Sequence, residues 1–312
     1  MLTPSRFPHE PFTAADLRSI EIPRGDLRTA LADGRVRRVL RGVYVEAHLE
    51  DTVSLRVAAA RRVIASGSVV RDRTAAWLHG VDALSWAETE VLPPIETCVR
   101  RFEAPTRRAG VDGRTRDLLP RDVMDLDGVL VTTPLRTAID LGCNLKRRSA
   151  LASMDALSRL HGLERSQFFA ELPRFRGRRG VRQVRPLVPL VDWRRESQRE
   201  SWTALAISDA GLPAPEPQYW IEIGGVPVWR LDFAYPRHRV AIEYDGEEWH
   251  DRTPEQRKND RDRRDWMRKD GWIIIVVTKA ELGPDGPGAW IQTLTEALAD
   301  RATTLRRWVA PH

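Results

Sequence analysis

Three carboxylates lie in or beside two predicted strands of the C-terminal third. Asp232 falls inside one apolar strand, Glu243 falls inside the next, and Asp245 ends that second strand. Residues two apart in a strand share a face, so Glu243 and Asp245 point the same way, and the turn at Pro236 brings Asp232 opposite Glu243. Converging carboxylate oxygens suit Mg2+ or Mn2+, which can activate water to attack a phosphodiester. The pattern predicts a metal centre on Asp232 and Glu243.

A second explanation of these acids needs no metal. Asp is depleted in strands, and like charges on adjacent strands destabilise a sheet, so something must offset their cost. Arginine side chains can do this by forming salt bridges, and the candidates are Arg230, Arg239 and Arg264. The residues alone leave both explanations open.

The elements that position these acids follow the order αβββαβ. Hydrophobic periodicity, glycine stops and turn residues define them. Helices are expected at 196–210 and 257–269, and strands at 218–223, 226–234, 240–244 and 272–277. The Gly224-Gly225 pair predicts a tight hairpin between the first two strands.

A second set of candidate functional residues lies near the N-terminus. Short helices at 13–19 and 24–33 precede a hairpin of strands 36–40 and 43–45, which is the order of a winged helix. Five arginines lie on these elements: Arg24 and Arg28 on the second helix, and Arg37, Arg38 and Arg41 on the hairpin. They predict DNA binding, with the helix in the major groove and the hairpin on phosphates. A solvated basic face is the alternative.

The composition fits a basic protein of several domains. The chain has 312 residues, 42% of them apolar, and a net charge of +6, and arginine supplies all but four of its 50 basic residues. Cys98 and Cys143 have no spacing typical of a zinc ribbon or a disulfide scaffold. No apolar run is long enough to span a membrane and the N-terminus lacks an apolar signal core, so a cytoplasmic protein is expected.

These patterns predict an α+β multidomain protein. Four segments are expected: a winged helix at 1–80, an α/β scaffold or interaction domain at 81–173, a basic linker at 174–195 and the acid-bearing domain at 196–312.

The C-terminal segment resembles a known nuclease family. The runs 231–236 and 240–246, followed by Trp249-His250, are similar to the very-short-patch-repair-like (Vsr-like) branch of the PD-(D/E)xK nucleases. The resemblance spans about 196–282 and includes Glu200, Gln218, Asp260, Arg264 and Gly271-Trp272. It implies a restriction-endonuclease-like fold.

The same resemblance implies roles for single residues. Asp232 corresponds to the metal-binding Asp and Glu243 to the acid of the (D/E)xK element, while Glu200 matches a further helical acid. His250 resembles a histidine placed near the scissile phosphate. Asp245 departs from the pattern, because the superfamily has lysine there. Asp245 would then ligate the metal, with His250 or Arg264 in the cationic or acid–base role.

The N-terminal half resembles AbiEi-type winged-helix antitoxins and transcriptional regulators. Gly34-Arg35, the run 41–44 and the run 75–80 carry this likeness, as do Thr132-Thr133-Pro134, Arg136-Thr137 and Asp140. It covers about 10–160 and implies DNA binding, with autoregulation beside a nucleotidyltransferase toxin.

Two functional hypotheses follow. The leading one is a DNA-binding protein with a metal-dependent endonuclease domain that uses Mg2+ or Mn2+. The alternative is a non-catalytic regulator or antitoxin that keeps the nuclease fold. DNA is the expected partner in both, and the antitoxin hypothesis adds a cognate toxin. A homodimer fits a winged-helix regulator, although no heptad pattern demonstrates it.

Overall fold

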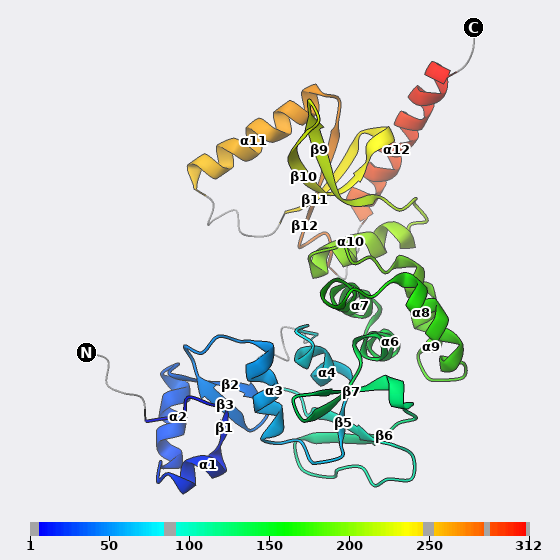
Figure 1. Ribbon diagram of the computed structural model, residues 1–312. Helices are drawn as coiled ribbons and strands as arrows, with labels where there is room; N and C mark the ends of the chain where they lie inside the picture. The colour runs from blue at the N-terminus through cyan, green and yellow to red at the C-terminus, as the bar shows by residue number, and fades with distance from the viewer. Residues whose placement is uncertain (1–5, 84–91, 246–252, 284–287, 310–312) are drawn as a thin grey trace. The chain divides into compact units, whose positions relative to one another are not determined.

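The computed structural model describes residues 6–83, 92–245, 253–283 and 288–309, and its fold is α+β with three sheets (Figure 1). The chain divides into two compact units. The N-terminal unit comprises Met1–Leu145 and Leu160–Val184, and the C-terminal unit comprises Lys146–Arg159 and Arg185–His312. None of the helices in the described ranges combines the length and apolar character needed to cross a membrane.

The N-terminal unit begins with two helices beside a small sheet. Its elements are β1 (Phe12–Thr13), α1 (Ala14–Ser19), α2 (Arg24–Ala32), β2 (Val36–Leu40) and β3 (Val43–Glu46), and the strand order is β1-β3-β2. Thr13 caps α1 in a capping box with Asp16. Gly42 has φ of 81°, which suits the hairpin turn between β2 and β3. The helices and hairpin follow the predicted order.

A mixed five-stranded sheet completes this unit together with flanking helices. The strands are β4 (Val69–Val70), β5 (Ile95–Val99), β6 (Val111–Thr115), β7 (Val123–Leu126) and β8 (Val129–Thr132), in the order β6-β5-β4-β8-β7. The helices before and after the sheet strands are α3 (Val53–Arg61), α4 (Asp72–Leu78) and α6 (Pro134–Asn144). The next helix, α7 (Arg147–His161), falls almost entirely in the segment Lys146–Arg159 of the C-terminal unit. Thr133 caps α6 and Pro134 opens it, as the sequence predicts.

Residues 174–195, predicted as a basic linker, are folded. They contain α9 (Val181–Leu187) and follow α8 (Arg165–Glu171), and Val184, Leu187 and Val188 are fully buried. Gly180 has φ of 82°, and a Cβ there would lie 2.1 Å from the Cys143 carbonyl oxygen, so the chain turns where only glycine fits. The sequence analysis predicted a linker because it weighed the many arginines of this segment and not the spacing of its apolar residues.

The C-terminal unit is built on a four-stranded sheet. Its elements are α10 (Gln198–Asp209), β9 (Glu216–Ile223), β10 (Val226–Tyr235), β11 (Val240–Asp245), α11 (Pro254–Lys269), β12 (Ile273–Thr278) and α12 (Gly288–Val309). The strand order is β12-β11-β10-β9, and β11 runs parallel to β12 while the other pairs are antiparallel. The order αβββαβ is as predicted, whereas the sequence analysis did not anticipate α12.

The two faces of this sheet carry different chemistry. On one face, Phe233 and Ile242 share an apolar cluster with Ile207 of α10 and Leu294 of α12. On the other face, Met267 of α11 packs with apolar residues of β10 and β11. Side chains alternate along a strand, so the acids next to Phe233 and Ile242 lie on the α11 face.

Candidate functional site

The antiparallel pairing of β10 and β11 brings Asp232 beside Glu243. Phe233 pairs with Ile242 in this ladder, so the preceding and following positions are neighbours. Tyr244 N donates a hydrogen bond of 2.8 Å to Asp232 Oδ2. The carboxyl group of Asp232 is thereby held against the edge of β11.

Two arginines of α11 neutralise the other acids on this face. Arg263 Nη2 lies 2.8 Å from Glu243 Oε1. Arg264 contacts both Glu243 (3.5 Å) and Asp245 (3.4 Å). Glu243 and Asp245 are nevertheless buried, with less than a tenth of each exposed.

Of the three arginines proposed as salt-bridge partners, only Arg264 reaches these acids. Arg230 pairs with Glu196 at 2.8 Å and Arg239 with Asp270 at 3.7 Å. Sequence reasoning missed Arg263. Its position one turn before the sheet-facing Met267 would have indicated it.

Glu200 supplies a further buried carboxylate from the first turn of α10. Ser197 caps this helix, and Glu200 Oε2 accepts hydrogen bonds from Gln218 Nε2 (2.7 Å) and Glu196 N (3.0 Å). Among the described side chains, no arginine forms an ion pair with Glu200 or Asp232. Within the described residues, the hydrogen-bond donors to both carboxylates are amide groups.

Burial, followed by the charges of Glu200 and Glu243, raises the pKa of Asp232 to about 6. The hydrogen bond from Tyr244 N acts in the opposite direction and does not cancel this effect. Asp232 therefore lies in an acidic environment that favours either a proton or a cation.

The donor set is suitable for Mg2+ or Mn2+, because Asp232 and Glu243 offer hard oxygen ligands. Glu243 already binds Arg263, so a cation there would exchange with that guanidinium. The acids of this sheet do not converge as closely as another group of residues. Within the described ranges, one group of three His, Cys, Asp or Glu side chains has all its ligand atoms within 4.8 Å of one another, and it consists of His9, Glu46 and His48. His250, the other residue proposed for this site, lies outside the described residues.

The predicted DNA-contacting arginines fall into two groups. Arg24 and Arg28 are exposed on α2, and no carboxylate in the described part of the chain pairs with them. Arg37, in contrast, donates from Nη2 to the Leu49 carbonyl oxygen at 2.9 Å. Arg38 is exposed and stacks over the Tyr44 ring, and Arg41 is exposed at the hairpin turn.

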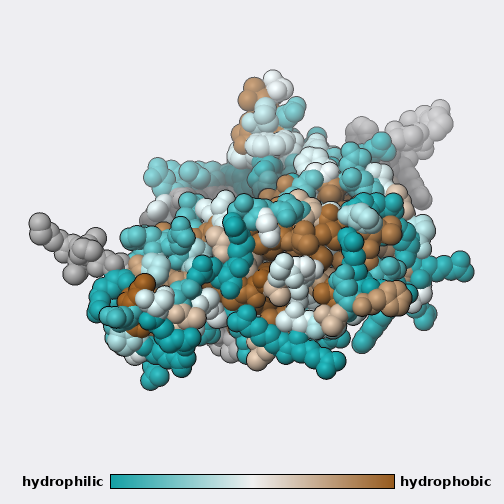
Figure 2. Space-filling view, turned by 60° about the horizontal axis from the view of Figure 1, so that its bottom comes forward, coloured by the Kyte–Doolittle hydropathy of each residue, from teal (hydrophilic) through white to brown (hydrophobic). Residues whose placement is uncertain are grey.

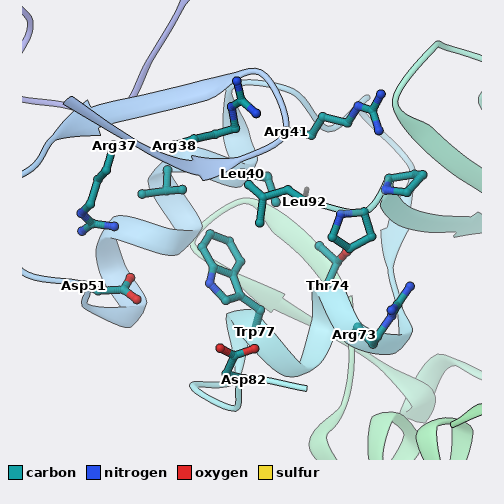
Figure 3. A pocket seen from close by; sticks show the side chains of 13 residues that line it. Arg37, Arg38, Leu40, Arg41, Asp51, Arg73, Thr74, Trp77, Asp82 and Leu92 are labelled. Carbon is teal, nitrogen blue, oxygen red and sulfur yellow. The ribbon is translucent and has the colours of Figure 1, made fainter. Parts of the chain in front are cut away.

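The hairpin arginines also line a hollow of about 190 Å³ within the N-terminal unit (Figure 3). Its walls combine Arg37, Arg38, Arg41 and Arg73 with the Trp77 ring, and Arg24 and Arg28 do not line it. The space-filling view also shows apolar areas bordered by hydrophilic side chains on one face of the molecule (Figure 2). The hollow therefore combines four guanidinium groups and the carboxylates of Asp51 and Asp82 with an aromatic surface.

A buried ionic network lies in the N-terminal unit, mainly within residues 81–173, which the sequence analysis interpreted as a scaffold or interaction domain. Arg136, only 3% exposed, donates to Asp122 from Nη1 and to Asp140 from Nε, both at 2.9 Å. Arg174 binds Asp122 at 2.8 Å, and Arg116 lies 3.1 Å from Asp140. The four-residue spacing of Arg136 and Asp140 on α6 was the available signal.

His79 is buried in the N-terminal unit, where it contacts backbone oxygen. Burial lowers the pKa of His79 to about 4, so its ring is neutral near pH 7. Its Nε2 lies 2.7 Å from the Thr132 carbonyl oxygen and must therefore carry the hydrogen. His161 Nε2 contacts the His79 carbonyl oxygen at 2.9 Å.

Comparison with known proteins places this network in a recognised domain. Residues 66–192 match the model of the AbiEi antitoxin C-terminal domain. The chain is also similar to two uncharacterized proteins of Mycobacterium tuberculosis, from strains CDC 1551 and H37Rv. Each is 35% identical over 254 residues, which cover 81% of this chain and 89% of the relative. This chain belongs to their family.

The AbiEi match locates the functional candidates relative to the shared domain. It includes Arg136 and Asp140, two of the residues on which the AbiEi resemblance was based. The arginines of α2 and the hairpin precede it, and the acids of the C-terminal sheet follow it. The nuclease resemblance of that sheet has no counterpart in these comparisons.

Proposed function

We propose that this protein is a DNA-binding regulator of the AbiEi antitoxin type. The observation that carries the proposal is the match of residues 66–192 to the AbiEi domain model, together with a helix and hairpin N-terminal to it whose exposed arginines have no carboxylate partner among the described residues. Arg24 and Arg28 are four residues apart on α2 and so share a helix face. A helix with this basic face, beside a basic hairpin, has the arrangement of a winged helix on duplex DNA.

Each exposed arginine contributes through phosphate contact and counterion release. Arg24, Arg28 and Arg41 have no carboxylate partner in the described residues that DNA would need to displace. Arg37 donates a hydrogen bond to the Leu49 carbonyl oxygen, so we expect it to orient the hairpin more than to contact phosphate. A toxin partner would be engaged through the AbiEi domain, as antitoxin action requires.

The test is DNA binding by fluorescence anisotropy, using the chain's own upstream DNA and a scrambled duplex at several salt concentrations. Arg24→Ala combined with Arg28→Ala should weaken binding at least tenfold and reduce the salt slope by about two. The matched control is Arg182→Ala with Arg185→Ala, which removes the same charge from exposed positions of α9. Equal affinity of the two double variants would contradict the proposal.

A second candidate function, metal-dependent phosphodiester hydrolysis, concerns the C-terminal unit. The observation that favours it is that half-buried Asp232 and buried Glu200 have no arginine partner among the described residues, while the charges of Glu200 and Glu243 both act on Asp232. Asp232 and Glu243 would hold Mg2+ or Mn2+, which when bound would supply the charge that activates water. Arg264 would then contribute a guanidinium beside the phosphate. Glu200 would add negative charge near Asp232 and so favour cation binding.

This candidate is tested by cleavage of supercoiled, linear, mismatched and single-stranded DNA with Mg2+, Mn2+ or EDTA. Asp232→Ala should abolish cleavage while changing DNA affinity less than twofold, because the proposed DNA contacts are on α2 and the hairpin. Cleavage by that variant at the wild-type rate would refute the site. Tight DNA binding without any cleavage by the wild type would leave the regulator as the function.

A further inference from the structure

A cluster of two histidines and one glutamate lies on the small N-terminal sheet. Glu46 is the last residue of β3, His48 follows it, and His9 precedes β1. Their ligand atoms all lie within 4.8 Å of one another. We call these residues the His–Glu–His cluster.

The register of the sheet explains why residues so far apart in sequence converge. β1 and β3 are antiparallel, and Phe12 pairs with Tyr44. Continuing this pairing toward the N-terminus sets position 9 level with position 47, between Glu46 and His48. The cluster is thus a consequence of strand pairing and not of a single flexible loop.

The centre of the cluster is a buried carboxyl group. Glu46 is only 3% exposed, whereas both histidines are exposed. His9 Nδ1 lies 2.7 Å from Glu46 Oε2, yet this oxygen receives no hydrogen bond of acceptable geometry from the described residues. A buried carboxylate in this position requires a cation close to it.

We propose that His9, Glu46 and His48 bind a divalent transition-metal ion of the zinc class. Two imidazole nitrogens and one carboxylate oxygen form a ligand set that zinc uses together with a solvent molecule. The exposed histidines leave the remaining position open to solvent. The mixed nitrogen and oxygen donors favour Zn2+ or Co2+ over Mg2+, which prefers oxygen ligands alone.

A metal at this position would tie the segment before β1 to the end of β3. It would therefore stabilise the pairing that supports the β2–β3 hairpin. Since the unfolded chain does not hold the three ligands together, bound metal should raise the melting temperature of the full chain by a few degrees. This site does not depend on the acids of the C-terminal sheet or on the proposed regulatory function.

The test uses the full chain, treated with chelator and then titrated with Zn2+ by calorimetry and with Co2+ by visible absorption. The wild type should bind one Zn2+ and give the intense Co2+ bands of a four-coordinate site. His48→Ala and His9→Ala should each weaken binding at least tenfold, and Glu46→Gln should do the same without removing side-chain volume. His238→Ala, which removes a partly exposed histidine from the C-terminal unit, is the matched control and should bind like the wild type.

Circular dichroism shows whether each variant is folded, and the exposed positions of His9 and His48 make loss of fold unexpected for those two. Absence of Zn2+ binding by the wild type would overturn the proposal. So would binding that His48→Ala and His9→Ala leave unchanged, because the metal would then be held elsewhere. An equal loss of Zn2+ binding in His238→Ala would also overturn the proposal, because that histidine lies outside the cluster.

Discussion

Two clusters of charged residues in this molecule differ in what compensates the loss of solvation of their carboxylates. In the N-terminal unit, Asp122 and Asp140 each contact two guanidinium groups, and Arg136 is shared between them. In the C-terminal unit, the partners of Asp232 and Glu200 among the described residues are amide groups, and burial raises the pKa of Asp232 to about 6. Pairing with arginines is typical of a cluster that supports a fold, whereas a carboxylate without an arginine partner leaves room for an external cation.

The largest expected effect comes from breaking the paired cluster. Arg136→Met removes the shared guanidinium and leaves Asp122 and Asp140 buried with fewer partners, so the free energy of unfolding should fall by about 3–5 kcal/mol. Urea denaturation measures this loss. The control, Arg121→Met, breaks an exposed contact with Glu171 and should cost less than about 1 kcal/mol. Similar losses in both variants would show that the network is not a structural centre.

The pH dependence of the two units should differ in sign. The folded pKa of His79 is about 4, below its ordinary value of 6.5, so the unfolded state binds a proton first as the pH falls. Stability of the N-terminal unit should therefore fall by up to about 3 kcal/mol between pH 6.5 and pH 4. Hydrogen exchange of α4 and β8 peptides measures this change. A His79→Gln variant should lose this pH response, and its persistence would assign the response to other groups.

Asp232 should behave in the opposite way in metal-free buffer. Its folded pKa is about 6, above the ordinary value of 3.8, so the folded state holds the proton more tightly and stability falls as the pH rises from about 4 to 6. Asp232→Asn keeps an acceptor for Tyr244 N and removes the charge. It should increase the free energy of unfolding by about 1–3 kcal/mol at pH 7.5 and change little at pH 4. Thermal melts with EDTA test this, and a less stable variant at pH 7.5 would contradict it.

The smallest expected effect tests whether the acidic cluster accepts a cation. Arg263→Gln removes the closest guanidinium from Glu243, so without metal the free energy of unfolding should fall by roughly 1–2 kcal/mol. Millimolar Mg2+ should restore more stability to this variant than to the wild type, because it replaces the missing charge. Arg268→Gln, which breaks an exposed contact with Asp265, is the control. If Mg2+ stabilises this variant no more than the wild type, the acidic cluster does not accept a cation in place of the guanidinium.

Much of the local structure could be predicted from the sequence. Strong signals lie within a few residues of each other: Thr133 and Pro134 open α6, the Arg41-Gly42 turn joins β2 and β3, and the acids follow the alternation of β10 and β11. The misses involve longer separations. The basic composition of 174–195 concealed a folded segment whose apolar residues are spaced among arginines.

The choice of charge partners was not predictable in the same way. The sequence analysis considered Arg230, Arg239 and Arg264, yet Arg263 makes the closest contact with Glu243. The phase of α11 relative to the sheet decides this, and it depends on how Met267 packs in the core. The cluster of His9, Glu46 and His48 was missed for a related reason, since strand pairing and not spacing brings its members together.

By itself the sequence determined which residues could do chemistry and the order of the elements that hold them. Hydrophobic periodicity, caps and turns are local properties, and each depends on only a few neighbouring residues. Only the tertiary structure decided which charges meet. Arg136 joins Asp122 to Asp140, whereas no arginine of the described residues forms an ion pair with Asp232. A charge is neutralised through space, so its partner depends on how helices and strands pack and not on distance along the chain.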